Sequence, residues 1–193
     1  MAHAPFLWPV LRTPTRKFWD RAASMWDTGR AADVAGRTAP LRKAIESIDP
    51  PPARILELGT GTGSGALVVA EHFPDADITA ADLSPEMVDE ARRKLTDDLR
   101  ERIHFEQADA AKLPYPDGSF DMVFQLNLPL YAAEVARVVR PGGTVVIAHT
   151  LGPRTPYYTP DAVLESKFAR LGIAETARGE AGIGTYFIAR RPA

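Results

Sequence analysis

Two kinds of hydrophobic pattern alternate along the chain after residue 52. Short apolar runs typical of buried strands occupy 54–58, 77–81, 102–107, 120–126 and 144–148. Between them, apolar residues recur at helical spacing over 63–72, 84–95 and 130–139. A last helix is predicted over 160–171, followed by two strands, 173–178 and 185–190, that form a closing hairpin. This alternation predicts an α/β fold in which helices cover both faces of a mostly parallel sheet.

The first 52 residues have a different pattern. Three prolines within residues 1–15 predict an extended start. Aromatic and small apolar residues then recur at helical spacing between residues 15 and 29, and a second helical segment covers 37–48. The run Asp49-Pro50-Pro51-Pro52 ends that segment. We therefore expect one domain over 1–193, with a helical cap at 1–50 and the α/β core at 53–193.

Composition narrows the class of protein. A chain of 193 residues suits a single domain, and its lack of cysteine excludes disulfides and Cys-ligated metals. Absence of cysteine also fits a reducing compartment, so we expect a cytoplasmic protein. No apolar run approaches the ~18–20 residues of a membrane span, and residues 1–10 lack the basic region of a signal peptide.

Charge is unevenly distributed along the chain. Residues 1–54 carry nine Lys or Arg and five Asp or Glu, although the whole chain has a formal net charge of −2. A basic segment attracts anions or lipid headgroups, and it is equally compatible with a solvated helix surface. Its charge density is too low for a nucleic-acid footprint, so we expect no nucleic-acid partner.

A glycine-rich loop follows the first strand of the core. The sequence there is Glu57-Leu58-Gly59-Thr60-Gly61-Thr62-Gly63-Ser64-Gly65, and Asp82 ends the second strand 19 residues after Gly63. Glycines let the backbone approach a ligand closely, and an acid at the end of the second strand accepts ribose hydroxyls. The pattern predicts an adenosine-type ligand at the carboxyl edge of the sheet. The loop alone leaves a dinucleotide open, whereas a Walker loop is excluded because no Gly-Lys-[Ser/Thr] follows.

Five ordered segments between residues 54 and 149 make the pattern more specific. Glu57-x-Gly59-x-Gly61-x-Gly63 resembles motif I of the class I S-adenosylmethionine-dependent methyltransferases. The segments 81–87, 107–114, 116–123 and 134–143 resemble the ribose-binding segment, the adenine-contacting segment, the entry to the fourth strand and the turn before the fifth. The resemblance implies a Rossmann-like three-layer sandwich with strand order 3-2-1-4-5-7-6, in which only the seventh strand is antiparallel.

The same resemblance implies cofactor contacts residue by residue. Glu57 would orient the glycine loop and the methionyl amino group, and Asp82 would hold the ribose. Asp109 would accept the adenine amino hydrogen. The remaining implied contacts are Gly59, Gly61 and Gly63 in the loop, Leu83, Met87 and Ala110 around the adenine, and Asn127 after the fourth strand. Structural roles without a ligand remain open for two of these residues, because Asp109 also suits a helix N-cap and Met87 suits core packing.

Candidate catalytic residues follow strand ends. His149 ends the fifth strand and is the best general-base candidate, since the ordinary pKa of histidine lies near 6.5; bonding to loop backbone is an equal alternative. Tyr131, in the segment after the fourth strand, is a site-lining candidate for the catalytic group. Trp19 and Trp26 could close a lid over the site or simply pack as an apolar helix face. No pair of histidines has metal-ligand spacing, so we expect no metal.

These observations favour one function and leave others open. We expect transfer of a methyl group from S-adenosylmethionine, leaving S-adenosylhomocysteine, to the oxygen, nitrogen or carbon of a small-molecule acceptor. A non-catalytic module that binds S-adenosylmethionine or a nucleotide is the first alternative. An NAD(P)-dependent oxidoreductase is the second, although no catalytic Tyr-Lys pair is evident. The sequence does not decide the oligomeric state.

Overall fold

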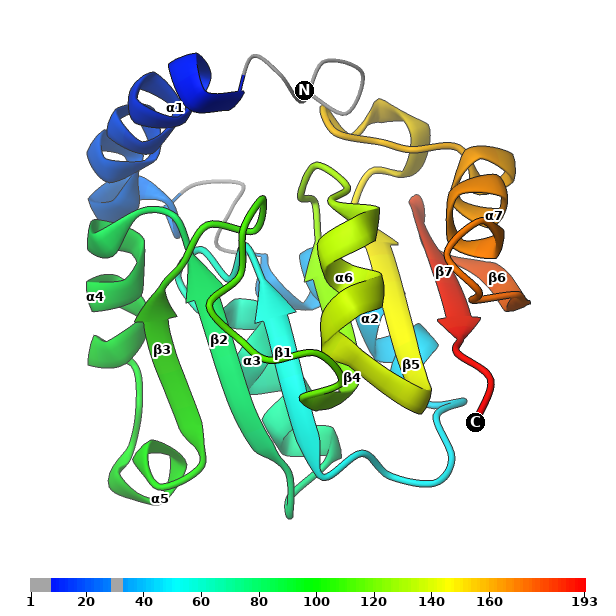
Figure 1. Ribbon diagram of the computed structural model, residues 1–193. Helices are drawn as coiled ribbons and strands as arrows, with labels where there is room; N and C mark the ends of the chain where they lie inside the picture. Colours follow the sequence, from blue (N-terminus) through cyan, green and yellow to red (C-terminus); the bar gives the residue numbers. More distant parts are fainter. Residues whose placement is uncertain (1–7, 29–32) are drawn as a thin grey trace.

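The fold is built on a seven-stranded sheet, seen face-on in Figure 1. The structure is a computed structural model and describes residues 8–28 and 33–193. The strands are β1 (Arg54–Leu58), β2 (Asp77–Asp82), β3 (Ile103–Gln107), β4 (Phe120–Leu126), β5 (Val139–His149), β6 (Glu175–Ala181) and β7 (Gly184–Arg190). They lie in the order β3-β2-β1-β4-β5-β7-β6, which confirms the predicted order.

Strand directions also follow the prediction. Strands β1 to β5 are parallel to their neighbours, while β7 is antiparallel to both β5 and β6. The reversal comes from the tight turn between Ala181 and Gly184, since a hairpin can join only antiparallel strands. Strand β1 lies between β2 and β4, so successive connections diverge on its two sides. Such a switch point leaves a crevice at the carboxyl ends of the strands.

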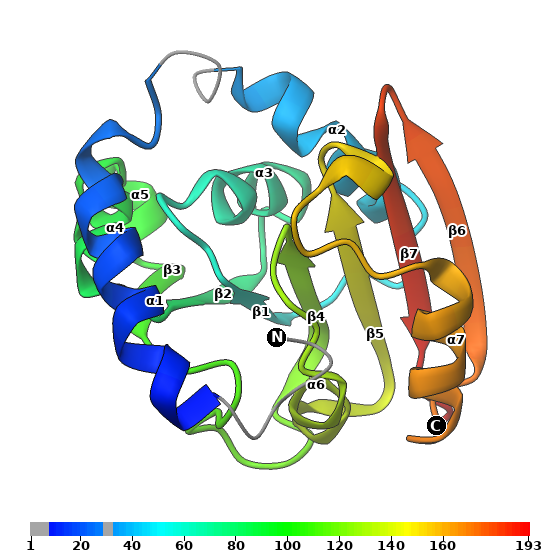
Figure 2. The same cartoon turned by 90° about the horizontal axis from the view of Figure 1, so that it is seen from above.

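Helices cover both faces of the sheet and make three layers, as the view from above in Figure 2 shows. On one face, α2 (Val34–Ile45), α3 (Ser64–His72) and α4 (Pro85–Arg93) pack with one side of β1 to β5 in a single apolar cluster. On the other face, α6 (Ala132–Val138) and α7 (Asp161–Ala169) pack with residues of β1, β2, β4, β5 and β7 in a second apolar cluster. The predicted Rossmann-like sandwich is confirmed.

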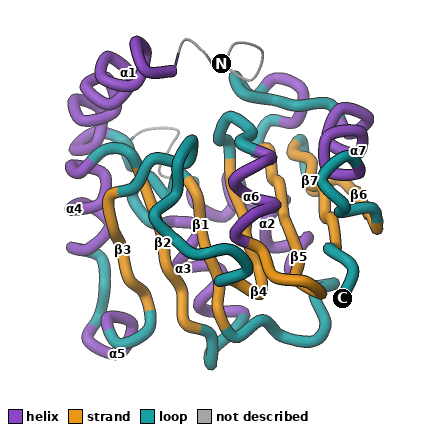
Figure 3. The backbone as a smooth tube through the Cα atoms, viewed as in Figure 1, coloured by secondary structure: helices purple, strands orange, loops and turns teal. Residues whose placement is uncertain are grey.

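One longer helix and three short elements remain. They are the fifteen-residue helix α1 (Trp8–Ala22), the 3-10 turns η2 (Ala23–Met25) and η4 (Gly152–Arg154), and the four-residue helix α5 (Asp97–Arg100). In Figure 3 the loops that follow the strands gather at the edge over which α1 lies. Within the described residues, none of the helices is long and apolar enough to cross a membrane.

The N-terminal prediction needs correction. Helix α1 begins at Trp8, so the extended start expected for residues 1–15 is wrong from residue 8 onward, and residues 1–7 lie outside the described ones. Pro9 is tolerated because it stands in the first turn, where its missing N–H costs no hydrogen bond. The second helix begins at Val34, three residues earlier than expected, because Asp33 caps it by accepting from the Gly36 N–H at 2.9 Å.

The turn predicted before the fifth strand belongs to the strand instead. Strand β5 begins at Val139, and its pairing with β4 is irregular between Phe120 and Met122. The segment 141–143 therefore forms a bulge within β5. Gly143 fits this bulge because a Cβ there would lie 2.9 Å from the carbonyl oxygens of Arg140 and Asp121.

Candidate active site

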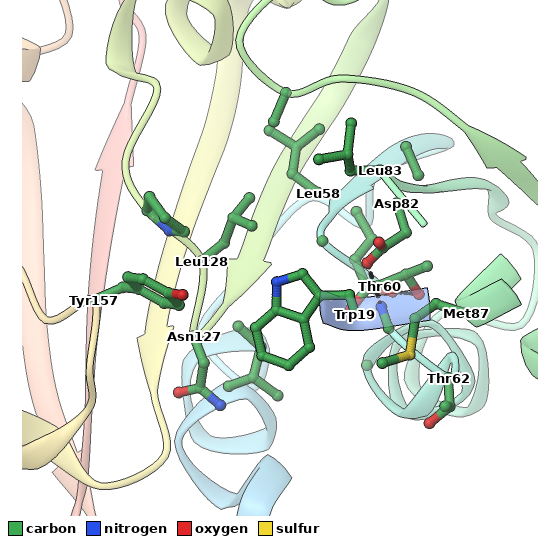
Figure 4. Close-up of a pocket in the computed structure, with 18 of the residues that line it drawn as sticks. Trp19, Leu58, Thr60, Thr62, Asp82, Leu83, Met87, Asn127, Leu128 and Tyr157 are labelled. Carbon is green, nitrogen blue, oxygen red and sulfur yellow. Dashed lines mark hydrogen bonds between the residues drawn. The ribbon is translucent and has the colours of Figure 1, made fainter. Parts of the chain in front are cut away.

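A pocket of about 520 Å³ opens at the carboxyl edge of the sheet, beside the switch point. Its volume is in the usual range for a cofactor or drug-sized ligand. The loops after β1, β2, β3, β4 and β5 form its floor and walls, and α1, η2 and α2 contribute side chains from above. Figure 4 shows Asp82, Trp19, Asn127 and Tyr157 around the same space. The pocket therefore collects segments from nearly the whole chain.

The glycine loop forms one wall of the pocket. The N–H groups of Gly59 and Thr60 both donate to the Ala81 carbonyl, at 2.8 and 3.1 Å, which ties the loop to the end of β2. Gly59 and Gly61 line the pocket and have φ values of 69° and 54°, which favour glycine. A Cβ on Gly61 would meet no atom closer than 3.9 Å, so the space over it is open to a ligand.

Gly63 does not line the pocket. Its φ is 86°, and a Cβ there would lie 2.7 Å from the ring of Phe105 and 3.1 Å from Ala91. The residue therefore lets the loop pack tightly against β3 and α4. Packing alone therefore explains why position 63 requires glycine. The cofactor contact that the resemblance implies for Gly63 stays a prediction.

Glu57 is a buried carboxylate beneath the loop, only 1% exposed. It accepts a hydrogen bond from the Thr60 hydroxyl at 2.6 Å and a second from the Ala66 N–H. Burial raises its pKa from 4.5 to about 7, against the effect of these two donors. A Cβ on Gly65 would lie 2.1 Å from the Glu57 Oε1, so the carboxylate occupies the space that a side chain at 65 would need.

Asp82 joins two loops at the end of β2. Its carboxylate accepts from the Gly61 N–H and from the Ser84 N–H, both at 2.9 Å. Burial raises the pKa of Asp82, although these backbone donors oppose the shift. Because a carboxylate has about four acceptor positions, the two backbone bonds leave capacity for ligand hydroxyls. Asp82, Leu83 and Met87 all line the pocket, and the cofactor contacts predicted for them stay a prediction.

Asp109 lies in the loop after β3 and faces α1. The Trp8 indole N–H donates to both carboxylate oxygens, at 3.1 and 3.0 Å, and the Arg12 guanidinium lies 2.9 Å away. The carboxylate also accepts from the Ala111 N–H at 2.9 Å. Asp109 and Ala110 both line the pocket. The cap therefore closes on the residue expected to recognise adenine.

Asn127 connects three elements at the other end of the pocket. Its side chain exchanges two 2.8 Å hydrogen bonds with Thr150, and the Thr150 hydroxyl donates to the Arg37 carbonyl at 2.8 Å. The Arg37 guanidinium donates to the Ser64 hydroxyl at 3.1 Å and lies 3.6 Å from Asp27. Asn127 and Arg37 line the pocket, so a fixed cation stands near the N-terminus of α3.

The two candidate catalytic residues differ in placement. Tyr131 lines the pocket with its ring edge-on to Trp8, and burial together with Asp109 raises the pKa of its hydroxyl. His149 is 2% exposed, does not line the pocket, and packs edge-on against Tyr158. Burial lowers its pKa to about 4, despite a hydrogen bond with the Tyr157 backbone, and its Nε2 has no partner in the described residues. The base role of His149 stays a prediction.

The aromatic side chains of the N-terminal segment divide between two faces. Trp19 and Trp26 line the pocket and contact each other edge-to-face at 5.1 Å. Phe18, by contrast, points outward and is 62% exposed. Trp8 and Arg37 were not predicted as site residues. Local pattern gives no signal for them, because their partners lie far away in the sequence.

Comparison with known proteins agrees with this geometry. Residues 55–143 match a family described as a methyltransferase domain. A demethylmenaquinone methyltransferase of Deinococcus radiodurans is 35% identical over 151 residues, which are 74% of this chain and 62% of that protein. A malonyl-[acyl-carrier protein] O-methyltransferase of Laribacter hongkongensis is 37% identical over 161 residues, 75% of this chain and 52% of that protein. The chain thus spans between half and two thirds of these relatives.

Solved structures show the same fold. A putative methyltransferase from Haloferax volcanii, in complex with the activator Trm112, superposes with a TM-score of 0.74 at 18% identity and covers 91% of this chain and 98% of that chain. A putative O-methyltransferase from Nostoc punctiforme has a TM-score of 0.71 at 17% identity, covering 90% and 60%. Sheet order, glycine loop and the match over residues 55–143 together support a class I S-adenosylmethionine-dependent methyltransferase domain in this chain.

Proposed function

We propose that this chain transfers a methyl group from S-adenosylmethionine to a small-molecule acceptor. The observation that carries the proposal is the arrangement of three carboxylates around one pocket. Glu57, Asp82 and Asp109 come from β1, β2 and the loop after β3, and each lines the same space. An elongated ligand with an amino group, a ribose and a base offers donors to all three in that order.

Each part of the site has a distinct task in this proposal. Asp82 accepts the ribose hydroxyls, and Asp109 accepts the adenine amino hydrogen. Glu57 holds the methionyl amino group, and the Arg37 guanidinium attracts the carboxylate at the same end of the pocket. When bound, the cofactor supplies an electrophilic methyl group on a sulfonium. Aromatic faces such as that of Trp19 favour a nearby cation.

The acceptor would enter on the side of the β4 and β5 loops. Leu128, Tyr131 and Tyr157 line that part of the pocket and present apolar or aromatic surface. This lining favours a planar or apolar acceptor, and the relatives described above are named for a demethylmenaquinone and a malonyl-[acyl-carrier protein]. Methyl transfer to a nucleophilic atom requires alignment above all, worth ~7–11 kcal/mol of barrier when the reacting groups are well positioned.

Proton removal is needed only where the accepting atom carries a proton at neutral pH. The Tyr131 hydroxyl remains protonated there, because its pKa is raised, and it therefore acts as a hydrogen-bond donor to an acceptor. Metal-free catalysis and a cytoplasmic location stay predictions. The described residues contain no cluster of three or more side chains that would hold a metal ion.

Two measurements test the proposal in sequence. Calorimetry is expected to show S-adenosylhomocysteine binding and much weaker binding of NAD. A screen of acceptors with radiolabelled methyl donor is then expected to label a small molecule. Tighter binding of NAD would favour an oxidoreductase, and cofactor binding without transfer to any acceptor would favour a non-catalytic module.

A further inference from the structure

Helix α1 has an outward face that the rest of the fold does not use. None of its fifteen residues is fully buried. Val10 is 74% exposed, Phe18 is 62% exposed, and Met25 in the following turn is 71% exposed. Leu11, also exposed, lies seven residues before Phe18, so two full turns place them on the same side of the helix. A row of large apolar side chains therefore faces away from the fold.

The opposite side of the same helix forms part of the active site. Trp8, Thr15 and Trp19 line the pocket, and Trp8 holds Asp109. Figure 2 shows α1 lying along the outside of the molecule, with α4 next to it. The single helix α1 therefore separates the pocket from the exposed apolar side chains.

Charge on the outward face has one sign among the described residues. Lys17 and Arg21 flank Phe18, and both are exposed with no ion-pair partner in that part of the chain. The acids of the segment point inward. Asp20 accepts from the Ser84 hydroxyl at 2.7 Å and from Arg16, and Asp27 binds Thr62 and Lys94.

Helix α4, which packs beside α1, adds little net charge. Asp89 pairs with Arg92 at 3.1 Å, and Glu90 pairs with Arg93 at 2.5 Å. Glu86 lies against Asp20 and near Arg16, on the inner side of α1. Asp20, Asp89 and Glu90 are thus each paired with a cation, whereas Glu86 shares Arg16 with Asp20 and leaves one acidic charge beside α1.

We propose that the outward face of α1, made of Val10, Leu11, Lys17, Phe18, Arg21 and Met25, docks on the surface of an anionic phospholipid bilayer. Interfacial helices combine apolar side chains that enter the headgroup region with cations that meet anionic lipids. Both features are present here, on a helix that is fixed to the fold mainly by polar contacts. An acidic protein would match the two cations but would leave the four apolar side chains in water.

Docking in this way would place the pocket at the lipid surface. An amphiphilic acceptor then passes from the bilayer to the pocket across a single helix. This consequence rests on the proposed function, whereas docking itself does not require methyl transfer. Failure of the two proposals can therefore be distinguished, because vesicle binding and cofactor binding are measured separately.

The test uses the full chain and vesicles of two compositions. We expect co-sedimentation with vesicles of equal phosphatidylcholine and phosphatidylglycerol, and little with phosphatidylcholine alone. The three tryptophans of the chain, Trp8, Trp19 and Trp26, all lie in this segment, so intrinsic fluorescence reports on it directly. Lipids brominated on their acyl chains are expected to quench that fluorescence only in the anionic vesicles.

Variants of the outward face test its two components. Replacing Lys17 and Arg21 by Gln together should lower the partition coefficient about thirtyfold, since each cation near an anionic surface is worth about 1 kcal/mol. Phe18→Ser should lower it on the order of tenfold or more, because an apolar ring no longer enters the interface. Matched controls on α7 and its end, Arg170→Gln and Leu171→Ser, should change nothing, since both are exposed far from α1.

For every variant, the melting temperature and the dissociation constant of S-adenosylhomocysteine are measured and must equal those of the wild type. Equal partition of the wild type and of the Phe18 and Lys17/Arg21 variants would overturn the proposal. So would binding to purified acyl carrier protein that depends on Lys17 and Arg21 in the absence of vesicle binding. That result would assign the face to an acidic protein partner instead.

Discussion

The indole Nε1 of Trp8 lies 3.1 and 3.0 Å from the two carboxylate oxygens of Asp109, although 101 residues separate them in the sequence. The N-terminal cap and the loop after β3, which we propose to contact adenine, are thus joined by one carboxylate. Trp8 contacts both oxygens, and the Ala111 N–H and the Arg12 guanidinium add one contact each, so a ligand donor would have to share or displace one of these four contacts. The contact therefore fastens α1 to the loop after β3 at one side of the pocket.

Removing the hydrogen bonds between Trp8 and Asp109 should speed release of the cofactor. Trp8→Phe keeps an aromatic side chain but removes the indole N–H. The lost hydrogen bond is to a charged group, and such a bond is worth about 1.5–3 kcal/mol. We expect the dissociation rate constant of S-adenosylhomocysteine to rise about tenfold in stopped-flow measurements. Phe18→Tyr, on the outward face of the same helix, is the matched control. An unchanged dissociation rate constant in a folded Trp8→Phe variant would show that the Trp8–Asp109 contact does not retain the cofactor.

Loss of the Asp82 carboxylate should weaken cofactor binding. Asp82→Ala removes the ribose acceptor and also frees the N–H groups of Gly61 and Ser84. We expect binding of S-adenosylhomocysteine to weaken by about 1.5–3 kcal/mol in calorimetry. Asp89→Ala on the exposed side of α4 is the control and should bind normally. Wild-type affinity in folded Asp82→Ala would remove this residue from the site.

Glu57 and His149 should influence stability with opposite pH dependence. Burial raises the pKa of Glu57 to about 7, so its cost to folding is present above pH 7 and disappears as pH falls to 4.5. Burial lowers the pKa of His149 to about 4, so stability is lost as pH falls from 6.5 to 4. Each effect amounts to at most about 3 kcal/mol. The two therefore largely cancel in the wild type.

Single variants should reveal each effect. Between pH 8 and pH 5, the free energy of unfolding of Glu57→Gln is expected to fall relative to that of the wild type as pH drops, because Glu57 no longer offsets the His149 effect. That of His149→Gln is expected to rise over the same interval. Urea unfolding at a series of pH values measures both. Two variants with the same pH dependence as the wild type would contradict the assignment.

Asn127 offers a test of backbone strain. Its φ is 59°, in the left-handed region, and its side chain makes two hydrogen bonds with Thr150. Asn127→Gly and Asn127→Ala lose the same hydrogen bonds, but only glycine adopts this φ without strain. We expect Asn127→Ala to be less stable than Asn127→Gly by about 1 kcal/mol in urea unfolding. Equal stability would mean that the surrounding structure relaxes freely.

The catalytic role predicted for His149 has a kinetic test. If a hydroxyl acceptor is used and His149 removes its proton, His149→Ala should lose on the order of 10²–10⁴ in kcat with little change in cofactor affinity. Its placement outside the pocket favours a different result, in which KM changes more than kcat because Tyr157 and Tyr158 are no longer supported. Full activity on a hydroxyl acceptor would rule out the base role.

The sheet and the glycine loop were predictable because local pattern determines them. Short apolar runs that alternate with helical segments predict buried parallel strands. A glycine loop after the first strand and Asp82 after the second predict a ligand site at the carboxyl edge of the sheet. Trp8 and Arg37 were not predictable, since their partners Asp109 and Thr150 lie 101 and 113 residues away. The start of α1 was missed because prolines generally disfavour a helix, whereas α1 has Pro9 in its first turn and Pro14 in its interior.

The position of His149 depended on information that the sequence pattern does not contain. The prediction rested on the rule that residues past strand ends point toward the crevice. Strand β5 continues through His149, so the side chain still alternates with the strand and lies on the sheet face toward α7. The last residue of a strand therefore follows the alternation of that strand, and the rule for residues beyond strand ends does not place its side chain.

The contact between Gly65 and the Glu57 carboxylate has a consequence for how substitutions combine. A methyl group at 65 would have to displace the carboxylate, so Gly65→Ala should impair cofactor binding as severely as loss of Glu57. Shortening the acid, as in Glu57→Asp, would make room for it. The two positions should consequently vary together among homologous chains, and an alanine at the first helical turn should be found only where the residue beneath the loop is small.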